Sequence, residues 1–458
     1  MQRGRLVVVA NRLPVSVVSP DAVDDWKTSP GGLVSALAPI LQAHDGAWIG
    51  WTGHPDHEPA PFGHDGIHLV PTRMSAAEFE DHYLGFSNST LWPLYHDAVR
   101  WPEFHRHWWR PYRAVNRRFA ERAAHVAQPG DQIWVQDYHL QLVPEMLREL
   151  RPDVRIGFFL HIPFPPPELL AQIPWRREIL TGLLGADLVG FQTPDGARNF
   201  LEAVRQFLGL ESSGESVEWQ GRRVDVRDFP ISIDVEKFET LARNPAVQAR
   251  AQALRADLGG RRILLGVDRL DYTKGIHHRL RAFETLLARD PTTADRVTFL
   301  QIAVPSRGLV PEYADMRERI ERLVGRINGE SSRGGQVPVH YHHTNLEQED
   351  LVAHYLAADV MCVTPLRDGM NLVAKEYPVT RVDERGVLIL SEFAGAANEL
   401  HDALLVNPHD LDGMADAYTR ALDMPPEEQS ERMRRLRGAV GASDVHAWAL
   451  SFLEALAA

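Results

Sequence analysis

Short apolar runs that end in polar or charged residues recur along this chain, and they restrict its fold more than any other feature. Each run has the length of a β-strand, and a helical pattern follows most of them. The runs lie at residues 6–10, 47–51, 132–136, 155–160, 183–190, 224–229, 262–267, 297–304, 337–341, 360–363 and 386–390. Strands that alternate with helices form parallel sheets covered by helices on both faces. The sequence therefore predicts an α/β protein built from doubly wound, Rossmann-like parallel sheets.

The length of the chain, 458 residues, is too great for one ordinary core and predicts two domains. A polar, Gly- and Ser-rich stretch at 209–223 interrupts the end of the first strand series, and a new series starts at 262. We place the boundary near residue 235, which gives a first domain over 1–235 and a second over 236–440. Residues 441–458 are predicted to form a last amphipathic helix.

Charge and cysteine content exclude several classes of protein. The formal net charge of -13 argues against nucleic acid and anionic membranes as partners. The single cysteine, Cys362, lies in a predicted buried strand, so no disulfide can form within the chain. The run 6–10 is too short for a signal sequence, and no stretch is long enough to span a membrane. These features favour a cytoplasmic protein.

Three predicted strands of the first half end in a residue that can bind a ligand. Arg12, Asp137 and His161 follow the strands at 6–10, 132–136 and 155–160. Carboxyl ends of parallel strands meet at one edge of a sheet, where ligands of such folds bind. An arginine at the surface is the competing interpretation of Arg12. Gly31 and Gly32 open a predicted helix and would let a ligand approach the backbone.

Residues 82–118 are rich in aromatic, histidine and arginine side chains, among them Tyr83 and Trp92. Aromatic rings beside polar groups suit sugar binding, because a pyranose stacks its C–H face on an indole. Core packing is the competing interpretation, and we expect it for most of these rings, with one or two facing a ligand. Interleaved arginine and aromatic residues also bind single-stranded nucleic acid, but the acidic net charge argues against that use.

In the second half, Arg269 and Lys274 flank a tight turn between a strand and a helix. Arginine offers a planar fork and lysine a compact charge, so both can contact one phosphate group. Arg307 follows the strand at 297–304 in the same way. Two ordinary surface cations are the competing interpretation of Arg269 and Lys274.

The stretch 364–377 reads as a strand end, a glycine-containing turn and the start of a helix. Such a turn exposes backbone N–H groups and the positive end of a helix dipole, which suit an anion. It also carries Asp368, Lys375 and Glu376. An ordinary strand-to-helix turn with solvated charges is the competing interpretation.

Histidine groups raise the question of a metal site. His105 and His107 form one group, and His340, His342 and His343 form another. Zinc sites need three or four ligands in a fixed geometry, and neither group has a supporting cysteine or carboxylate at matching spacing. We expect no metal and no cofactor. Cations and carboxylates on two sheets that face a cleft suit transfer of a sugar from a nucleotide donor to a phosphorylated acceptor.

Long motifs in this sequence resemble the trehalose-6-phosphate synthase family, glycosyltransferase family 20. They lie at residues 11–14 (NRLP), 31–33, 134–140 (WVQDYHL), 157–165, 267–275, 326–329, 364–377 and 391–400. The resemblance covers nearly the whole chain. It implies the GT-B architecture, in which two Rossmann-like domains face a cleft and the last helix crosses back to the first domain.

The resemblance implies a retaining glucosyltransferase that moves glucose from a nucleoside diphosphate glucose to glucose 6-phosphate. We expect UDP-glucose as the donor in preference to GDP-glucose or ADP-glucose. The product is α,α-trehalose 6-phosphate, and the leaving phosphate takes the acceptor proton in a front-face attack. A cytoplasmic homo-oligomer, a dimer or tetramer, is implied as well. Two alternatives stay open: a pseudo-glycosyltransferase that joins cyclitol units, and a non-catalytic sugar-phosphate sensor. Intact Arg269, Lys274, Asp137 and Glu376 argue against the sensor.

The same resemblance implies a role for each matching residue. The catalytic residues would be Asp137, His161, Arg269, Lys274 and Asp368. The donor would be bound by Gly31, Gly32, His161, Arg269, Lys274, Leu346, Asp368, the backbone of Leu372, Val373, Ala374 and Lys375, and Glu376, which takes the ribose hydroxyls. The acceptor would be bound by Arg12, Tyr83, Trp92, Asp137 and Arg307. One departure from the family pattern is Pro378, which predicts a kinked or shortened helix after Glu376.

Overall fold

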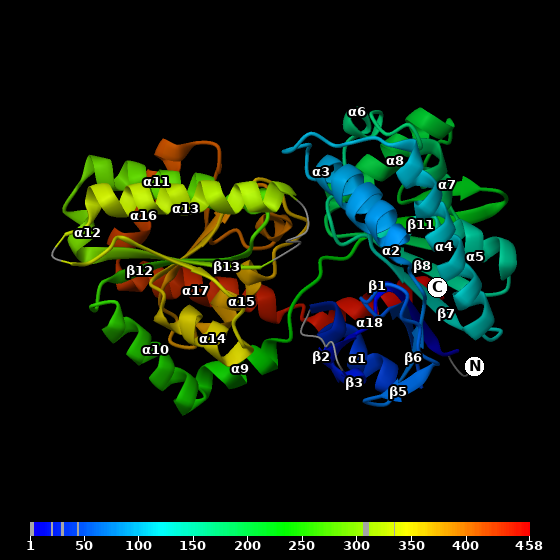
Figure 1. Ribbon diagram of the computed structural model, residues 1–458, viewed down its shortest axis with the longest axis horizontal. Helices are drawn as coiled ribbons and strands as arrows, with labels where there is room; N and C mark the ends of the chain where they lie inside the picture. Colours follow the sequence, from blue (N-terminus) through cyan, green and yellow to red (C-terminus); the bar gives the residue numbers. More distant parts are fainter. Residues whose placement is uncertain (1–3, 20–21, 29–31, 44, 306–310, 334) are drawn as a thin grey trace. The chain divides into compact units, whose positions relative to one another are not determined.

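The computed structural model describes residues 4–458 apart from 20–21, 29–31, 44, 306–310 and 334 (Figure 1). The chain forms two compact units. Unit 1 comprises Met1–Ile231 and Val445–Ala458, and unit 2 comprises Ser232–Asp444. The last helix is therefore part of unit 1, although it follows unit 2 in the sequence.

Unit 1 is built on a nine-stranded sheet in the order β10-β11-β9-β8-β7-β1-β4-β6-β5. The strands pair in parallel except at the two edges, where β10 with β11 and β5 with β6 are antiparallel. The strands are β1 (Leu6–Arg12), β4 (Ala47–Trp51), β5 (Phe62–His64), β6 (Ile67–Pro71), β7 (Gln132–Gln136), β8 (Arg155–Phe159), β9 (Leu188–Phe191), β10 (Ser216–Trp219) and β11 (Arg222–Asp228). The stretch 209–223, which we expected to interrupt the strand series, thus contains the edge strand β10. A separate antiparallel hairpin of β2 (Val15–Ser19) and β3 (Ala22–Thr28) was not predicted.

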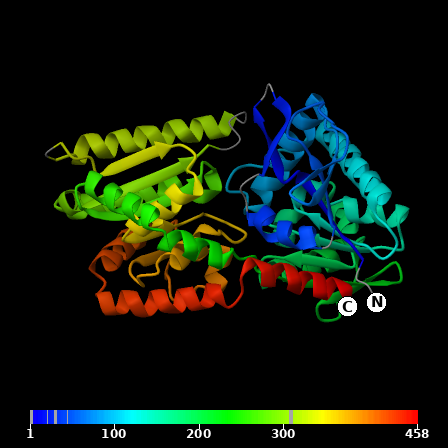
Figure 2. The same cartoon turned by 90° about the horizontal axis from the view of Figure 1, so that it is seen from below.

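The helices of unit 1 cover both faces of this sheet (Figures 1 and 2). They are α1 (Gly32–Ala43), α2 (Ala76–Glu78), η1 (Phe79–Leu91), α3 (Trp92–Tyr95), α4 (Arg106–Val126), η2 (Tyr138–Leu140), α5 (Val143–Leu150), α6 (Pro167–Leu170), α7 (Arg176–Leu184), α8 (Pro194–Leu208) and α18 (Val445–Ala457). Helix η1 is a 13-residue π-helix, a rare form that occurs mostly as single turns near functional sites.

Aromatic packing attaches α18 to the sheet of unit 1. The ring of Phe452 stacks on Trp134 of β7 at a centroid distance of 4.2 Å, and the indole N–H of Trp448 donates to the carbonyl of Phe229 at 3.1 Å. The close approach needs a glycine on β8, since a Cβ at Gly157 would lie 2.7 Å from Phe452. The apolar face predicted for the last helix is therefore buried against strands that lie far from it in the sequence, since Phe229 and Trp448 are 219 residues apart.

Unit 2 has a six-stranded, fully parallel sheet in the order β14-β13-β12-β15-β16-β17. Its strands are β12 (Arg262–Arg269), β13 (Val297–Val304), β14 (Val339–His343), β15 (Val360–Val363), β16 (Val387–Ser391) and β17 (Leu404–Val406). Its helices are α9 (Val235–Arg243), α10 (Pro245–Asp257), η3 (Tyr272–Lys274), α11 (Ile276–Arg289), α12 (Thr293–Arg296), α13 (Pro311–Ser331), α14 (Gln348–Ala357), α15 (Val373–Thr380), η4 (Gly395–Asn398), α16 (Leu411–Asp423) and α17 (Pro426–Gly441). Helices α11, α13 and α16 pack together on one face, and α9, α10, α14, α15 and α17 pack on the other (Figure 1). The predicted α/β class with two parallel sheets is confirmed.

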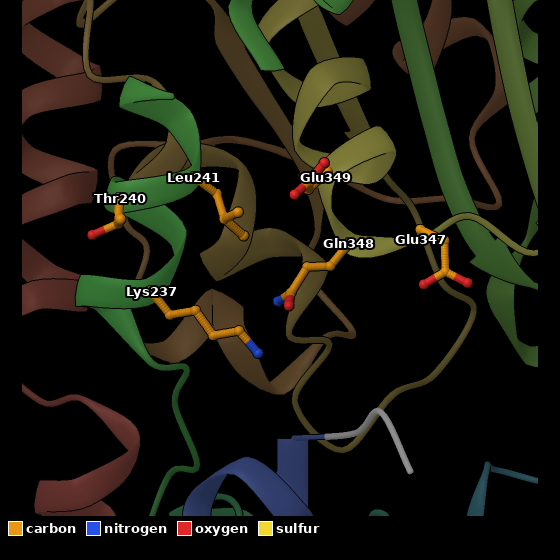
Figure 3. Close-up of a pocket in the computed structure, with 6 residues that line it drawn as sticks. All are labelled: Lys237, Thr240, Leu241, Glu347, Gln348 and Glu349. Atoms are coloured by element: carbon orange, nitrogen blue, oxygen red, sulfur yellow. The ribbon is translucent and has the colours of Figure 1, made fainter. Parts of the chain in front are cut away.

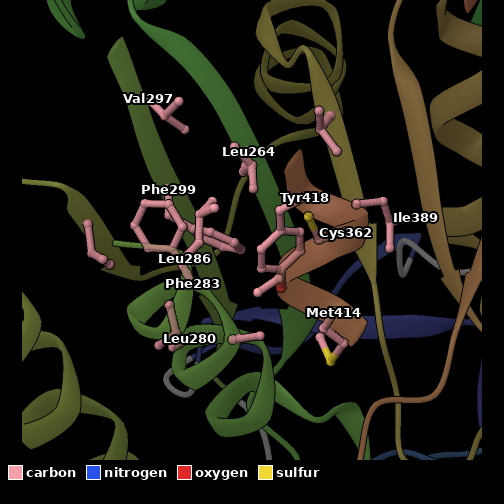
Figure 4. Close-up of a cluster of buried hydrophobic side chains, with 14 of the residues drawn as sticks. Leu264, Leu280, Phe283, Leu286, Val297, Phe299, Cys362, Ile389, Met414 and Tyr418 are labelled. Carbon is pink, nitrogen blue, oxygen red and sulfur yellow. The ribbon is translucent and has the colours of Figure 1, made fainter. Parts of the chain in front are cut away.

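The core of unit 2 lies between this sheet and α11 and α16 (Figure 4). Phe283 of α11 and Phe299 of β13 pack at 5.4 Å between ring centroids, and Tyr418 of α16 closes the layer. Cys362 of β15 is fully buried here, and burial raises the pKa of its thiol to about 12. As expected, it is a small core residue and not a reactive thiolate.

Pro378 has the effect that its position predicts. It lies in the second turn of α15, and this helix has only 8 residues and ends at Thr380. The N–H of Arg381 then donates to the carbonyl of Pro378 at 3.1 Å. The helix is therefore short, and its first turn, which carries Glu376, is complete.

Candidate active site

Asp137 and His161 meet at the carboxyl ends of β7 and β8. The backbone N–H of His161 donates to Asp137 Oδ1 at 3.2 Å. Asp137 has φ 72° and ψ 169°, a backbone conformation that is almost exclusive to glycine. A non-glycine residue in such a conformation stores on the order of 1–3 kcal/mol of strain, and such residues cluster at functional sites. This backbone conformation changes the direction of the chain at Asp137, directly after the end of β7.

His161 is held as a neutral imidazole by Gln136, the last residue of β7. Its Nε2 lies 2.8 Å from Gln136 Oε1, and burial lowers the pKa of His161 to about 3. An amide oxygen only accepts, so Nε2–H donates and Nδ1 keeps its lone pair. At neutral pH the ring therefore carries no charge, and Nδ1 can accept a hydrogen bond from a sugar hydroxyl.

Arg12 and Tyr83 belong to one aromatic stack in unit 1. The guanidinium carbon of Arg12, at the end of β1, lies 5.0 Å from the centroid of the Trp51 ring, within the range of a cation–π contact. Tyr83 lies 6.5 Å from Trp51 and stacks on His139 at 5.5 Å with an interplanar angle of 7°. Because β1 neighbours β7 in the sheet, Arg12 ends the strand next to the one that carries Asp137.

Most of the aromatic residues at 82–118 are buried, as expected. Trp92 is 4% exposed and packs against Tyr138 at 5.7 Å, next to Asp137 in the sequence. Tyr83 is only partly buried. Trp101 is the exception, with 88% of its surface exposed.

Lys274 and Asp368 form an ion pair in unit 2. Lys274 Nζ lies 2.5 Å from Asp368 Oδ2, and both side chains are about nine-tenths buried, with exposures of 11% and 12%. Asn371 donates to the same carboxylate oxygen at 3.0 Å. Asn371 has a φ of 75°, a left-handed conformation that asparagine tolerates better than most residues. Arg269 ends β12 and is exposed.

A buried arginine supports the two loops that carry this pair. Arg279 of α11 is fully buried and forms an ion pair with Asp268 of β12. Its guanidinium also donates to Thr364 Oγ1 at 2.9 Å and to the carbonyl of Lys274 at 3.3 Å. Arg279 therefore ties the loop after β12 to the loop after β15 from behind.

Backbone contacts also join these two loops directly. The N–H of Leu366 donates to the carbonyl of Thr273 at 2.7 Å. Gly275 has φ 68°, and a Cβ there would lie 2.3 Å from the carbonyl oxygen of Thr364. The glycine of the Lys274–Gly275 turn is therefore required by both conformation and space.

The start of α15 offers two backbone N–H groups to an anion. The N–H groups of Ala374 and Lys375 donate to the carbonyls of Asn371 and Leu372 at 3.2 and 2.8 Å. Within the described part of the chain, those of Leu372 and Val373 have no acceptor. Of the four backbone positions expected at the donor phosphates, the structure thus leaves two N–H groups available at the helix N-terminus.

The side chains of Lys375 and Glu376 both contact other side chains of unit 2. Lys375, 1% exposed, pairs with Glu399 at 2.7 Å; burial lowers its pKa and Glu399 raises it. Glu376 Oε2 accepts from the hydroxyl of Tyr355 at 2.7 Å. Burial raises the pKa of Glu376, and the hydrogen bond from Tyr355 lowers it.

Leu346 is half-buried in the loop between β14 and α14. The residues that follow it help to line a pocket of about 620 Å³ (Figure 3). Its lining comprises Lys237, Thr240 and Leu241 of α9 with Glu347, Gln348 and Glu349 at the start of α14. No residue that we predicted from the sequence lines this pocket.

Two expected donor or acceptor residues, Gly31 and Arg307, lie outside the described residues. Gly32 is the first residue of α1, in agreement with a glycine at a helix start. In the described ranges no group of three or more histidine, cysteine, aspartate or glutamate residues could hold a metal ion. No helix among the described residues has the length and apolar character needed to cross a membrane.

Sequence reasoning missed the side chains that hold the predicted ones. Gln136, Asn371 and Tyr355 contact His161, Asp368 and Glu376, respectively. Gln136 and Asn371 lie within three residues of a predicted site residue and could have been suspected. Tyr355 lies 21 residues from Glu376 and gives no local signal.

Comparison with known proteins agrees with the motifs. The sequence profile of glycosyltransferase family 20 matches residues 4–458. The trehalose-6-phosphate synthase of Mycolicibacterium gilvum is 56% identical, with 98% of this chain and 93% of that protein covered. A structure from E. coli with bound UDP-2-fluoro glucose is similar at 36% identity and a TM-score of 0.92, over 99% of both chains.

A crystal structure of the α,α-trehalose-phosphate synthase (UDP-forming) of Burkholderia xenovorans in complex with glucose-6-phosphate is also similar. It shares 36% identity and a TM-score of 0.91, over 99% of this chain and 100% of that one. The expected GT-B fold is therefore confirmed, and the chain belongs to glycosyltransferase family 20.

Proposed function

We propose that this chain transfers glucose from UDP-glucose to glucose 6-phosphate, with retention, and forms α,α-trehalose 6-phosphate and UDP. The observation that carries the proposal is the buried Lys274–Asp368 pair at the strand ends of unit 2, in a family 20 chain. It provides a cation for a diphosphate beside a carboxylate for a sugar hydroxyl. The ligands of the two similar structures, UDP-2-fluoro glucose and glucose-6-phosphate, support the choice of substrates.

In the proposed reaction, the C1 hydroxyl oxygen of glucose 6-phosphate bonds to C1 of the donor glucose. The bond from that carbon to the β-phosphate oxygen breaks, and the departing diphosphate takes the hydroxyl proton. Negative charge grows on the leaving oxygen, and Lys274 and Arg269 stabilise it. The N–H groups at the start of α15 bind the same phosphates.

The remaining residues orient the two sugars. Asp368 and neutral His161 accept hydrogen bonds from hydroxyls of the donor glucose, and Glu376 accepts hydrogen bonds from those of the ribose. Arg12, Tyr83, Trp92 and Arg307 surround the acceptor phosphate, and Asp137 binds the acceptor sugar. We accordingly propose that unit 1, as the N-terminal domain, supplies most acceptor contacts and that unit 2 binds the nucleotide. Gly31, Gly32 and Leu346 complete the donor site in this proposal.

The enzyme is further proposed to be a cytoplasmic homo-oligomer. The single, buried Cys362 supports a reducing compartment, since it offers no disulfide within the chain. Light scattering of the purified protein tests the oligomer, and a monomer at micromolar concentration would refute it.

A donor screen tests the function. Release of the nucleoside diphosphate is followed with UDP-, GDP- and ADP-glucose, each with and without glucose 6-phosphate. We expect release that depends on glucose 6-phosphate and is fastest with UDP-glucose. No release with any of the three donors would overturn the proposal and leave the sensor interpretation.

A further inference from the structure

Tyr355 and Glu376 come from two neighbouring helices of unit 2, α14 and α15 (Figure 1). The Tyr355 hydroxyl lies 2.7 Å from Glu376 Oε2. Tyr355 is fully buried, and Glu376, in the first turn of α15, is partly buried. The hydroxyl therefore reaches the carboxylate from the protein interior.

The position of Tyr355 is determined by its surroundings. Its ring meets that of Tyr377 edge to face, at 6.4 Å and 83°, and its backbone carbonyl accepts from Arg381 at 3.4 Å. An ionised carboxylate only accepts hydrogen bonds, and the pKa of Tyr355 is raised well above its usual value by burial. The tyrosine is therefore a permanent donor.

The carboxylate of Glu376 has two oxygens in different situations. Oε2 is occupied by Tyr355. Oε1 accepts no hydrogen bond from any residue that the structure describes. Without the bond from Tyr355 the carboxylate could rotate, and its two oxygens would become equivalent.

We infer that Tyr355 is a positioning residue for the donor nucleotide: it holds Glu376 Oε2 so that Oε1 is aimed at the ribose hydroxyls. The inference rests on the proposed contact between Glu376 and the ribose. The bond from Tyr355 would allow Glu376 to discriminate a ribose from a deoxyribose. A carboxylate oxygen that is held in place cannot turn to another donor, so a ligand without the matching hydroxyl loses more binding free energy.

The test compares Tyr355→Phe with Tyr377→Phe. Tyr377 is an equally buried tyrosine of unit 2, and its hydroxyl donates to the carbonyl of Ala358 at 3.3 Å and not to Glu376. Calorimetry measures binding of UDP, 2′-deoxy-UDP and 3′-deoxy-UDP to wild type and both variants. We expect the wild-type preference for UDP over at least one deoxy form to fall roughly three- to tenfold in Tyr355→Phe, and to be kept in Tyr377→Phe.

Steady-state kinetics give a second readout. In Tyr355→Phe the KM for UDP-glucose should rise by a similar factor, while kcat and the KM for glucose 6-phosphate change less than twofold. A wild-type preference that Tyr355→Phe retains in full would overturn the inference alone. A wild type that does not distinguish UDP from either deoxy form would overturn both the inference and the ribose contact of Glu376. Turnover by the wild type tests the proposed reaction independently of binding.

Discussion

Several predicted ligand groups of unit 2 are held by charges and hydrogen bonds, whereas in unit 1 Arg12 and Tyr83 lie in an aromatic stack and Asp137 has a strained backbone. In unit 2, Asp368 contacts Lys274 and Asn371, and Glu376 contacts Tyr355. In unit 1, the Arg12 guanidinium lies against the ring of Trp51, and Asp137 has a conformation suited to glycine. The groups proposed for the donor in unit 2 are thus preorganised by polar partners, which suits a diphosphate. Two of the groups proposed for the acceptor in unit 1, Arg12 and Tyr83, lie among aromatic rings, which suits a hexose.

The largest effect is expected when the ion pair between Lys274 and Asp368 in unit 2 is removed. Lys274→Met removes the cation proposed for the leaving diphosphate, and it removes the ion pair of Lys274 with the buried Asp368. We expect kcat to fall roughly 10²- to 10³-fold, as for the loss of one transition-state donor, in a UDP-release assay. Lys237→Met is the matched control, because Lys237 is an exposed lysine of the same unit. Near-normal turnover of Lys274→Met would contradict the role of the pair.

The next prediction separates two properties of Asp137, its strained backbone conformation and the role of its carboxylate in the reaction. Asp137→Ala and Asp137→Gly both remove the carboxylate, and we expect each to lose roughly 10²-fold or more in kcat/KM. Only glycine adopts the observed φ of 72° without strain. Asp137→Gly should therefore be more stable than Asp137→Ala by about 1–2 kcal/mol.

Tryptophan fluorescence during urea unfolding measures this difference in unit 1 alone, since all 11 tryptophans lie there. Equal stability of the two variants would show that the conformation of Asp137 is not strained.

A smaller effect tests the aromatic stack. Tyr83→Phe keeps the ring on His139 but removes the hydroxyl proposed to contact the acceptor phosphate. We expect the KM for glucose 6-phosphate to rise about tenfold, with little change for UDP-glucose. Tyr95→Phe is a control, because the Tyr95 hydroxyl is buried and donates to Gln141. A rise in the KM for UDP-glucose alone would contradict the proposed contact between Tyr83 and the acceptor phosphate.

The last prediction concerns stability in acid and His82, which lies in η1 and is fully buried. Burial lowers its pKa from 6.5 to about 3, so the unfolded chain binds the proton first. The stability that depends on neutral His82 is therefore fully present above about pH 6.5 and is lost as the pH falls toward 3. The loss is at most about 1.4 kcal/mol per pH unit for this residue.

His82→Phe should reduce the loss of stability between about pH 6 and pH 4, whereas His125→Phe, at an exposed histidine of the same unit, should not. Fluorescence-detected urea unfolding at both pH values measures the difference. The same acid loss in both variants would contradict the role of His82.

Much of the fold and part of the site follow from local patterns in the sequence. Apolar runs predicted the parallel strands, and the polar residues after them predicted Asp137, His161, Lys274 and Asp368 at strand ends. What local patterns do not contain are contacts between distant segments. The bond from Tyr355 to Glu376 and the packing of α18 on β7 depend on tertiary structure.

Unusual backbone conformations were also not predicted from the sequence. The π-helix Phe79–Leu91 and the strained φ of Asp137 have no local signature, because they oppose the intrinsic preference of their residues. The hairpin of β2 and β3, which pairs with neither main sheet, was also missed.

The most direct test of the proposed reaction is the proton NMR spectrum of the product formed from UDP-glucose and glucose 6-phosphate. Retention at the donor carbon and attack by the acceptor C1 hydroxyl predict a 1,1-linked, non-reducing disaccharide phosphate. Both of its anomeric protons should show the small coupling of an α linkage. A β-linked anomeric signal, a reducing disaccharide, or free glucose released by hydrolysis would contradict the proposal.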